Sequence, residues 1–387
     1  MDLNGILHEA IARGASDVHL KVGMPPMIRT HGILHAVEEA GPIGREGMAA
    51  ILNVLLDDHH RERFRSRMQV DLAYQTAEST RFRVNVFLQR GDPSVAMRAI
   101  PARIRTVEEL HLPPIVNKLA LENRGLILVT GTTGSGKSTT LAAMVAHINE
   151  NCSNHIITIE DPIEYTHQDV NSIVSQRELG YDVSTFSDGL KAALRQDPDV
   201  ILVGEMRDLE TIETAILAAE TGHLVLSTLH TLDATETITR IVSNFPEHQR
   251  EQIRIILGNI IRGILSQRLM PRADGQGMVP AVEVMVSTAR IRDCISVKEK
   301  TAEIRDAIAV GHSSYGMQTF DQSLMSLYRR NLVTYEEALA QSSNPDDFAL
   351  KVRGIASTSD RRWEDFERAP QEEFETDAPE RLKIDRF

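Results

Sequence analysis

The sequence has little cysteine and no long apolar run, and each shortage excludes a class of protein. Its 387 residues include only two cysteines, Cys152 and Cys294. Two thiols cannot form a disulfide framework or a four-cysteine zinc site, and they suit a reducing compartment. The longest apolar runs, GLILV and VILVG, are far shorter than a membrane span. Because the first ten residues, MDLNGILHEA, have neither a basic start nor an apolar signal core, the sequence predicts a cytoplasmic protein.

Basic residues are also in short supply. Lys and Arg number 42 against 55 Asp and Glu, a formal net charge of −13. An acidic chain is poorly suited to sequence-independent binding of nucleic acid or anionic lipid. The sequence shows no basic segment interleaved with aromatic residues, of the kind that lines a nucleic-acid groove. This argues against one possible function, that of a DNA-translocating motor. We therefore expect no nucleic-acid partner.

The first hundred residues predict a small α+β domain, residues 1–102. Apolar residues at helical spacing predict helices over residues 2–14 and 45–66, and alternating segments between and after them predict strands. In the segment RFRVNVFL, the apolar side chains at positions 82, 84, 86 and 88 are predicted to face one way and those of Arg81 and Arg83 the other. Residues 103–116 are rich in proline and predict a linker.

From residue 117 the pattern changes to apolar runs that alternate with helical stretches. Runs that are apolar throughout indicate strands buried on both faces, and intervening helices indicate a parallel sheet, so the predicted fold class is α/β. Residues 246–270 and 301–340 are predicted to be all helical. The domain is expected to end near residue 356, and the acidic segment 357–387 to be disordered or loosely docked.

The segment GTTGSGKST predicts a phosphate-binding loop. Its glycines let successive backbone N–H groups point at phosphate oxygens, Lys137 would bridge the β- and γ-phosphates, and the Ser138 hydroxyl would hold Mg²⁺. The alternative is a chance match, but an apolar strand precedes the loop and a helical stretch follows it, as the motif requires. The predicted nucleotide-binding residues are Gly131, Thr132, Thr133, Gly134, Ser135, Gly136, Lys137, Ser138 and Thr139.

Carboxylates at strand ends supply the second part of a hydrolase site. Glu205 follows the run VILVG and would help to hold Mg²⁺; the alternative is a surface glutamate. The segment IITIEDPIEY offers Glu160, Asp161 and Glu164, of which one could act as general base or position water, although a purely structural turn is the alternative. His223 and His230 lie at the two ends of a predicted buried strand and could sense the γ-phosphate, or be structural.

Four motifs in order resemble those of one family. GTTGSGKST, ITIEDPIEY, GEMRD and TGHLVLSTLHT are similar to the Walker A, Asp box, Walker B and His box of the secretion ATPases that drive type II secretion and type IV pili. Within that superfamily, which includes GspE- and PilB-like motors, ASDVHL, RFRVNVF and GMQTFDQSL resemble the PilT/PilU retraction ATPases. The chain also lacks the four cysteines and the long amino-terminal region usual in the extension and secretion motors. The segment YEEALAQSSNPDDFALKVRGI and the acidic tail resemble PilU more than PilT.

The resemblance implies a fold and a function. It implies a PAS-like amino-terminal domain, a RecA-like ATPase domain and a hexameric ring that binds ATP and Mg²⁺. Arginines of the small domain would reach the phosphates in a neighbouring subunit, and the matching residues are Arg81, Arg83 and Arg98. Implied partners are other copies of the chain, a sister ATPase and the inner-membrane platform protein of the pilus, which would hold the cytoplasmic motor at the inner membrane. The function implied is pilus retraction; the alternative is a co-motor that assists a sister ATPase.

Overall fold

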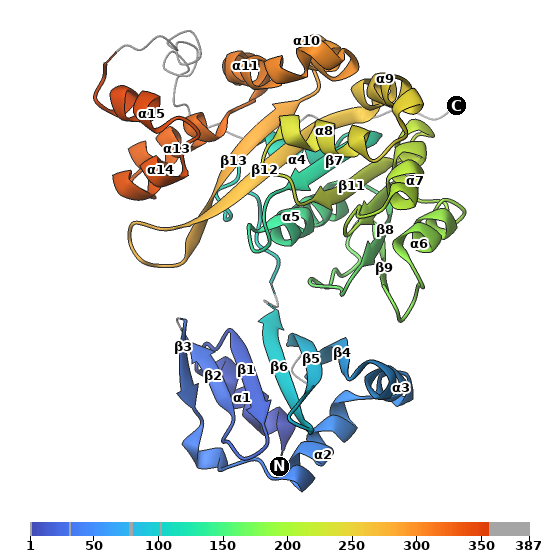
Figure 1. Cartoon of the computed structure of the whole chain (residues 1–387), viewed down its shortest axis with the longest axis vertical. Coiled ribbons are helices and arrows are strands. Elements are labelled where there is room, and N and C mark those ends of the chain that lie inside the picture. Colours follow the sequence, from blue (N-terminus) through green and yellow to red (C-terminus); the bar gives the residue numbers. More distant parts are fainter. Residues whose placement is uncertain (1, 31, 77–79, 101–102, 356–387) are drawn as a thin grey trace.

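The computed structural model describes residues 2–30, 32–76, 80–100 and 103–355, and Figure 1 shows that they form two lobes. The smaller lobe ends with a strand that finishes at Ile100, and the larger lobe follows it. The predicted acidic tail lies outside the described residues. The exact domain boundaries predicted above stay predictions. Among the described residues, no helix is long and apolar enough to span a membrane.

The amino-terminal lobe is built on a six-stranded antiparallel sheet with the order β3-β2-β1-β6-β5-β4. Its elements are α1 (Leu3–Ala12), β1 (Asp17–Lys21), β2 (Met27–Thr30), β3 (Ile33–Ala36), η1 (Glu38–Ala40), α2 (Arg45–Leu55), α3 (Asp58–Arg67), β4 (Gln69–Gln75), β5 (Arg81–Gln89) and β6 (Asp92–Ile100).

Local sequence explains most of this lobe. In β5, Phe82, Val84 and Val86 are buried, as the alternation predicts, whereas Leu88 near the end of the strand is exposed. The helix predicted over residues 45–66 is instead two helices, because Leu56 is extended and the Asp57 side chain begins α3 by accepting from the backbone N–H of His60.

The larger lobe is an α/β structure around a seven-stranded sheet with the order β13-β12-β7-β11-β10-β8-β9. The pairings are parallel, except that β13 runs antiparallel to β12. The strands are β7 (Gly125–Thr130), β8 (His155–Glu160), β9 (Ile173–Glu178), β10 (Val200–Val203), β11 (Leu224–Leu229), β12 (Ile261–Pro271) and β13 (Met278–Val286). The helices are α4 (Ile115–Ala120), α5 (Lys137–Asn151), α6 (Phe186–Ala193), α7 (Leu209–Glu220), α8 (Ala234–Ser243), η2 (Glu247–Gln249), α9 (Arg250–Ile260), α10 (Ala289–Ser296), η3 (Lys298–Glu303), α11 (Ile304–Val310), α12 (His312–Tyr315), α13 (Phe320–Arg329), α14 (Tyr335–Gln341) and α15 (Pro345–Val352).

The all-helical prediction for residues 246–270 is wrong in its second half. Helix α9 ends at Ile260, and β12 begins at the next residue. A short apolar run fits a buried helix or a buried strand equally well, so pairing with β7 and β13 decided the outcome. Strand β13 was not predicted either. The helical prediction for residues 301–340 agrees with η3 to α14, apart from one bridge between Gln318 and Val284.

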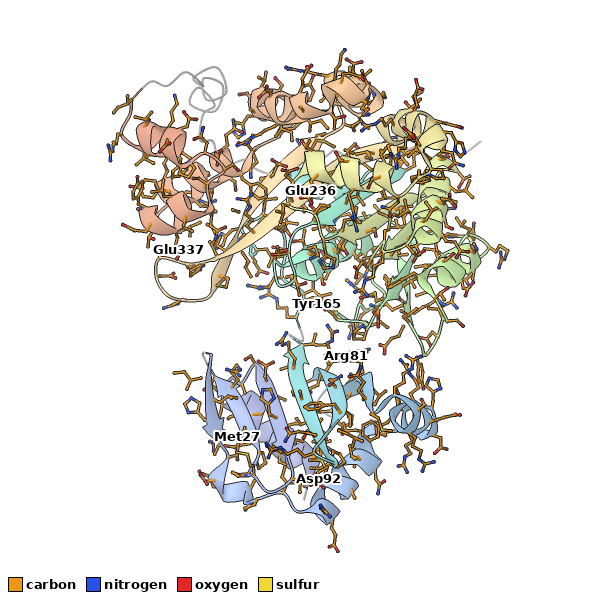
Figure 2. All side chains as sticks on the ribbon, viewed as in Figure 1. Met27, Arg81, Asp92, Tyr165, Glu236 and Glu337 are labelled. Carbon is orange, nitrogen blue, oxygen red and sulfur yellow. The ribbon has the colours of Figure 1, made fainter. Side chains whose placement is uncertain are left out.

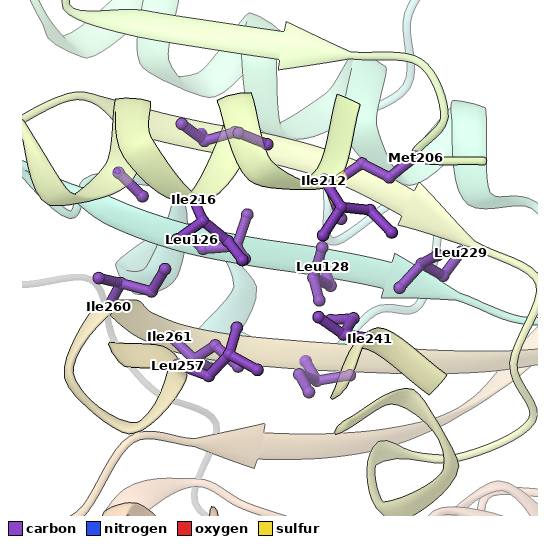
Figure 3. Close-up of a cluster of buried hydrophobic side chains, with 14 of the residues drawn as sticks. Leu126, Leu128, Met206, Ile212, Ile216, Leu229, Ile241, Leu257, Ile260 and Ile261 are labelled. Atoms are coloured by element: carbon purple, nitrogen blue, oxygen red, sulfur yellow. The ribbon is translucent and has the colours of Figure 1, made fainter. Parts of the chain in front are cut away.

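The core of the larger lobe fixes the positions of its strand ends. Figure 3 shows Leu126 and Leu128 of β7 packed near Ile212 and Ile216 of α7. Every residue of β7 and β11 is buried, because helices or neighbouring strands cover both faces. The carboxyl ends of the parallel strands β7, β8, β10 and β11 therefore meet at one edge of the sheet, where Gly131, Glu160, Glu205 and His230 emerge.

Candidate nucleotide-binding site

The loop between β7 and α5 has the backbone that a phosphate-binding loop needs. Gly131, Gly134 and Gly136 all have positive φ angles, of 140°, 81° and 92°. At Gly131 the constraint is also steric, because a Cβ would lie 2.4 Å from the carbonyl oxygen of Gln267 and 2.5 Å from Ser135 Oγ. Only glycine fits there without displacing β12 or the loop itself.

Lys137 is the first residue of α5, so its side chain lies beside the positive end of that helix. Its Nζ donates to the carbonyl oxygens of Gly131 and Thr132, at 2.8 and 2.9 Å. Burial lowers the pKa of Lys137, and the nearby carboxylates Glu205 and Glu164 oppose that effect. The loop therefore concentrates positive charge at a point that acidic side chains already surround.

Glu205 follows β10 and lies in a small charged cluster. Its Oε1 is 2.6 Å from Arg207 Nε and 3.2 Å from His230 Nε2, and its side chain is only 17% exposed. The Glu205 carboxylate raises the pKa of Arg207. Arg207 has no role in the sequence predictions above, since a lone arginine after a strand is an ordinary surface residue.

Glu160 ends β8 and is held more tightly than the other carboxylates. Its Oε1 accepts from Thr158 Oγ1 at 2.7 Å and from Gln176 Nε2 at 3.1 Å. Burial raises the pKa of Glu160, and these two hydrogen bonds only partly oppose the rise. A carboxyl with a raised pKa is a stronger base once it is ionised, which suits proton abstraction from water.

Arginines of the amino-terminal lobe approach the same region. Arg83 Nη1 lies 3.6 Å from Glu164 Oε1, whereas Arg98 Nε pairs with Asp17 of its own lobe at 2.9 Å. Arg83 and Arg98 are directly opposite each other on β5 and β6, an arrangement of like charges that costs stability unless anions lie nearby. Figure 2 shows Arg81 at the edge of the smaller lobe that faces Tyr165 across the gap between the lobes.

One cavity of about 570 Å³ brings most of the predicted residues together. It is lined by Thr133, Gly134, Gly136, Lys137, Ser138 and Thr139 of the loop, by Glu160, Asp161, Glu164, Glu205 and His230, and by Arg83 and Arg98. The arginines that line it belong to the same chain. Arg81 is not among its lining residues and pairs with Glu178 instead.

His223 does not reach this cavity. It precedes β11, beside Gly125 at the amino end of β7, and its Nδ1 is 3.0 Å from the carbonyl oxygen of Ala218. His230 lies at the other end of the six-residue strand, about 20 Å away at 3.3 Å per residue. Within one chain, His230 therefore lies at the cavity and His223 does not.

A second cavity of about 360 Å³ lies against the loop and was missed from the sequence. It shares Gly136 and Thr139 with the first cavity, and its lining includes Arg105, His111 and Arg272. Arg272 Nη1 lies 3.2 Å from His111 Nε2. These residues come from the predicted linker and from the end of β12 and beyond, so no local sequence signal joins them. A nucleotide held at the loop thus has space on two sides.

The described residues contain no cluster of three or more His, Cys, Asp or Glu side chains placed to hold a metal ion by themselves. The two donors predicted from the sequence, the Ser138 hydroxyl and the Glu205 carboxylate, both line the first cavity, as do the carboxylates of Glu160, Asp161 and Glu164. Oxygen donors of this kind are the ones that Mg²⁺ takes in proteins, usually together with water and nucleotide phosphates.

Comparisons with known proteins identify the family of the chain. A family model described as type II/IV secretion system protein matches residues 1–344. The type IV pilus retraction ATPase PilT of Pseudomonas aeruginosa is 42% identical over 90% of this chain and 100% of its own. PilU of the same organism is 39% identical over 93% of each chain. A crystal structure of the retraction motor PilT with bound ADP superimposes with a TM-score of 0.83, at 45% identity, over 90% of this chain and 98% of that one. The predicted α/β fold class is thereby confirmed.

Proposed function

The chain belongs to the type II/IV secretion system protein family as a PilT/PilU-type ATPase of pilus retraction and twitching motility, and we propose how its pocket performs that activity. The observation that carries the proposal is the composition of the first cavity. A phosphate-loop lysine, four acidic side chains and two arginines of the other lobe line one space. That set of side chains can bind a nucleotide and activate water, and its arginines can link the state of the nucleotide to the position of the second lobe.

The phosphate groups of ATP would lie on the loop. The backbone N–H groups from Gly131 to Gly136 and the Lys137 ammonium would hold the β- and γ-phosphates, and the start of α5 would add its dipole. Mg²⁺, held through Ser138 and Glu205, would neutralise charge that develops on the phosphates. The second cavity would receive the ribose and base, because it adjoins the loop at Gly136 and Thr139 and shares none of the four carboxylates that line the first cavity.

The carboxylates at the strand ends would activate the attacking water. Glu160 is the better candidate for general base, since burial raises its pKa and two hydrogen bonds fix its orientation. Glu164 pairs with Arg83 and so is suited to respond to the position of the smaller lobe. His230, whose Nε2 lies 3.2 Å from Glu205 Oε1, would contact the γ-phosphate. For His223 a catalytic role stays a prediction without support from the geometry of the single chain.

The test of the site is Lys137→Ala in the purified full chain. Steady-state ATP hydrolysis should fall to background, because the ammonium that contacts the β- and γ-phosphates is lost. Lys118→Ala, at an exposed lysine on α4, is the matched control and should hydrolyse ATP like the parent. Equal rates for Lys137→Ala and the parent would show that the site is wrongly assigned.

The source of the arginines can be tested by mixing two inactive variants. Lys137→Ala keeps Arg83, and Arg83→Ala keeps the loop. If arginines act on a neighbouring subunit, as the family resemblance implies, mixed rings should regain part of the parent activity. If Arg83 serves the pocket of its own chain, as its place in the cavity favours, mixing should restore nothing.

The finer identity of the motor is a separate proposal. The carboxyl-terminal segments resemble PilU, yet the identities to PilT and PilU are similar, so overall similarity does not favour the PilU assignment. We propose a hexamer that engages an inner-membrane platform protein and works beside a sister ATPase. Native mass measurement with and without ATP, alone and mixed with that sister, would reveal the assembly. Full retraction in cells lacking the sister would contradict a co-motor role.

A further inference from the structure

The start of β5 presents two arginines to the ATPase lobe. Arg81 and Arg83 are two residues apart, so both project from the same face of the strand. They contact different carboxylates. Arg83 pairs loosely with Glu164, at 3.6 Å with both side chains well exposed, whereas Arg81 Nη2 lies 3.2 Å from Glu178 Oε2 with side chains only 20% and 15% exposed. The Arg81–Glu178 pair is therefore the better shielded link between the lobes.

Glu178 is also bonded to the turn that carries the catalytic carboxylates. Its Oε2 accepts from the backbone N–H of Ile163 at 3.3 Å, and Ile163 lies between Glu160 and Glu164. Glu178 is the last residue of β9, directly beside Glu160 of β8 in the parallel pairing. One carboxylate oxygen thus joins an arginine of the amino-terminal lobe to the middle of the 160–164 turn. Glu178 is not among the residues that line the first cavity, and its hydrogen bond to the Ile163 N–H links it to the turn that does.

The segment after β9 makes further hydrogen bonds between the two lobes, close to the Arg81–Glu178 pair. The carbonyl oxygen of Gly180 accepts from Arg63 Nη1 at 3.3 Å and lies 2.9 Å from His59 Nε2, both on α3. Figure 1 shows this loop between β9 and α6 reaching toward α3. The backbone N–H of Glu178 donates to Asp182 Oδ2 at 2.8 Å, which fixes the glutamate within its own turn.

We propose that Glu178 is a positioning residue that couples the orientation of the amino-terminal lobe to the 160–164 turn. When Arg81 holds Glu178, the Ile163 N–H is held as well, and Glu160 and Glu164 keep their orientation toward the phosphates. A rotation of the small lobe that withdraws Arg81 frees Glu178 and loosens the turn. Hydrolysis is then fastest in one arrangement of the lobes. The inference rests on the proposed function, because it assigns catalysis to that turn.

The same geometry changes the role expected for Arg81. The family resemblance implies that Arg81 contacts phosphate, but in this chain its guanidinium is occupied by Glu178 and lies outside the cavity lining. Arg81 and Glu178 then form one functional unit, and removing either member should cost about as much as removing both.

A double-mutant cycle on the full chain tests the proposal. The variants are Glu178→Gln, Arg81→Gln and the double variant, with Glu210→Gln as the matched control. Glu210 pairs with Lys191 on the exposed surface of α6 and α7, so its replacement removes an ion pair far from the turn. The measurements are kcat and KM for ATP hydrolysis, the affinity for ADP, and the thermal midpoint.

Each single variant should lower kcat on the order of tenfold to a hundredfold, the cost of a slightly misplaced catalytic group, while ADP affinity stays within about twofold. The double variant should lose no more than either single variant, and Glu210→Gln should match the parent. Parent-like kcat in Glu178→Gln, multiplied losses in the double variant, or a fall in the thermal midpoint without a fall in kcat would overturn the proposal. If instead the parent itself shows no hydrolysis that depends on Lys137, the proposed function fails first.

Discussion

Replacing Glu283 by glutamine should make the stability of the ATPase lobe less dependent on pH. Glu283 lies on β13 with only 5% of its surface exposed, and its Oε1 accepts from the backbone N–H of Ala234 at 2.9 Å. Burial raises its pKa from 4.5 to about 7. Asp233 adds to the rise, whereas Arg305 and Arg268 oppose it.

The sign follows from proton binding. Between pH 4.5 and about 7 the folded chain keeps the Glu283 proton and the unfolded chain loses it. The folded state thus binds more protons in this window, and the free energy of unfolding falls as pH rises. At 1.36 kcal/mol per pH unit, the full loss above pH 7 is about 3 kcal/mol. Glutamine resembles the protonated acid, keeps an acceptor for the Ala234 N–H and has no proton to lose.

The assay is thermal unfolding followed by circular dichroism at several pH values from about 5 to 8. Parent and Glu283→Gln should unfold at similar temperatures near the acid end. At the alkaline end the variant should be higher by up to roughly 6–12 °C, since about 1 kcal/mol shifts the midpoint of a lobe this size by 2–4 °C. Glu213→Gln, at an exposed position on α7, is the matched control and should follow the parent. A constant offset between Glu283→Gln and the parent at every pH would refute the reasoning.

Three further predictions concern the site. His230→Ala should lower kcat for ATP hydrolysis, because His230 lies beside Glu205 at the cavity. His223→Ala should leave kcat unchanged and lower the free energy of unfolding by about 1 kcal/mol through its lost hydrogen bond. Equal effects of the two variants on hydrolysis would contradict the geometry. Gly131→Ala should abolish nucleotide binding because its Cβ would overlap the loop, and Gly134→Ala, where the Cβ meets nothing within 4 Å, should bind nucleotide more tightly than Gly131→Ala in a titration. Glu205→Gln should lower kcat and raise the Mg²⁺ concentration needed for half-maximal activity, and an unchanged Mg²⁺ requirement would remove Glu205 from the metal's ligands.

The sequence predicted the parts of the site that depend on local backbone chemistry. The loop from Gly131 to Thr139 needs glycine φ angles, a strand before it and a helix after it, and all of these are encoded within about twenty-five neighbouring residues. The buried strands β7, β8, β10 and β11 were predictable for the same reason, since each is a short run of apolar residues.

Contacts between distant segments could not be predicted in this way. The sequence around His223 and His230 does not distinguish them, because each flanks one end of the same strand. Only the parallel pairing of β11 with β7 places His230 beside the loop. Likewise, β12 has the apolar content of a helix and becomes a strand because β7 and β13 offer it partners. The second cavity combines residues more than a hundred positions apart.

The sequence by itself determined that this chain binds nucleotide phosphate, because a glycine-rich loop with a lysine and a helix start is a local structure with a local chemistry. The tertiary structure decided what surrounds that phosphate. It placed Arg83 and Arg98 of one lobe in a cavity of the other, and it paired Arg81 with Glu178. Such pairings depend on how two separately folded lobes meet, and that arrangement is set by packing over the whole chain and not by any neighbouring residues.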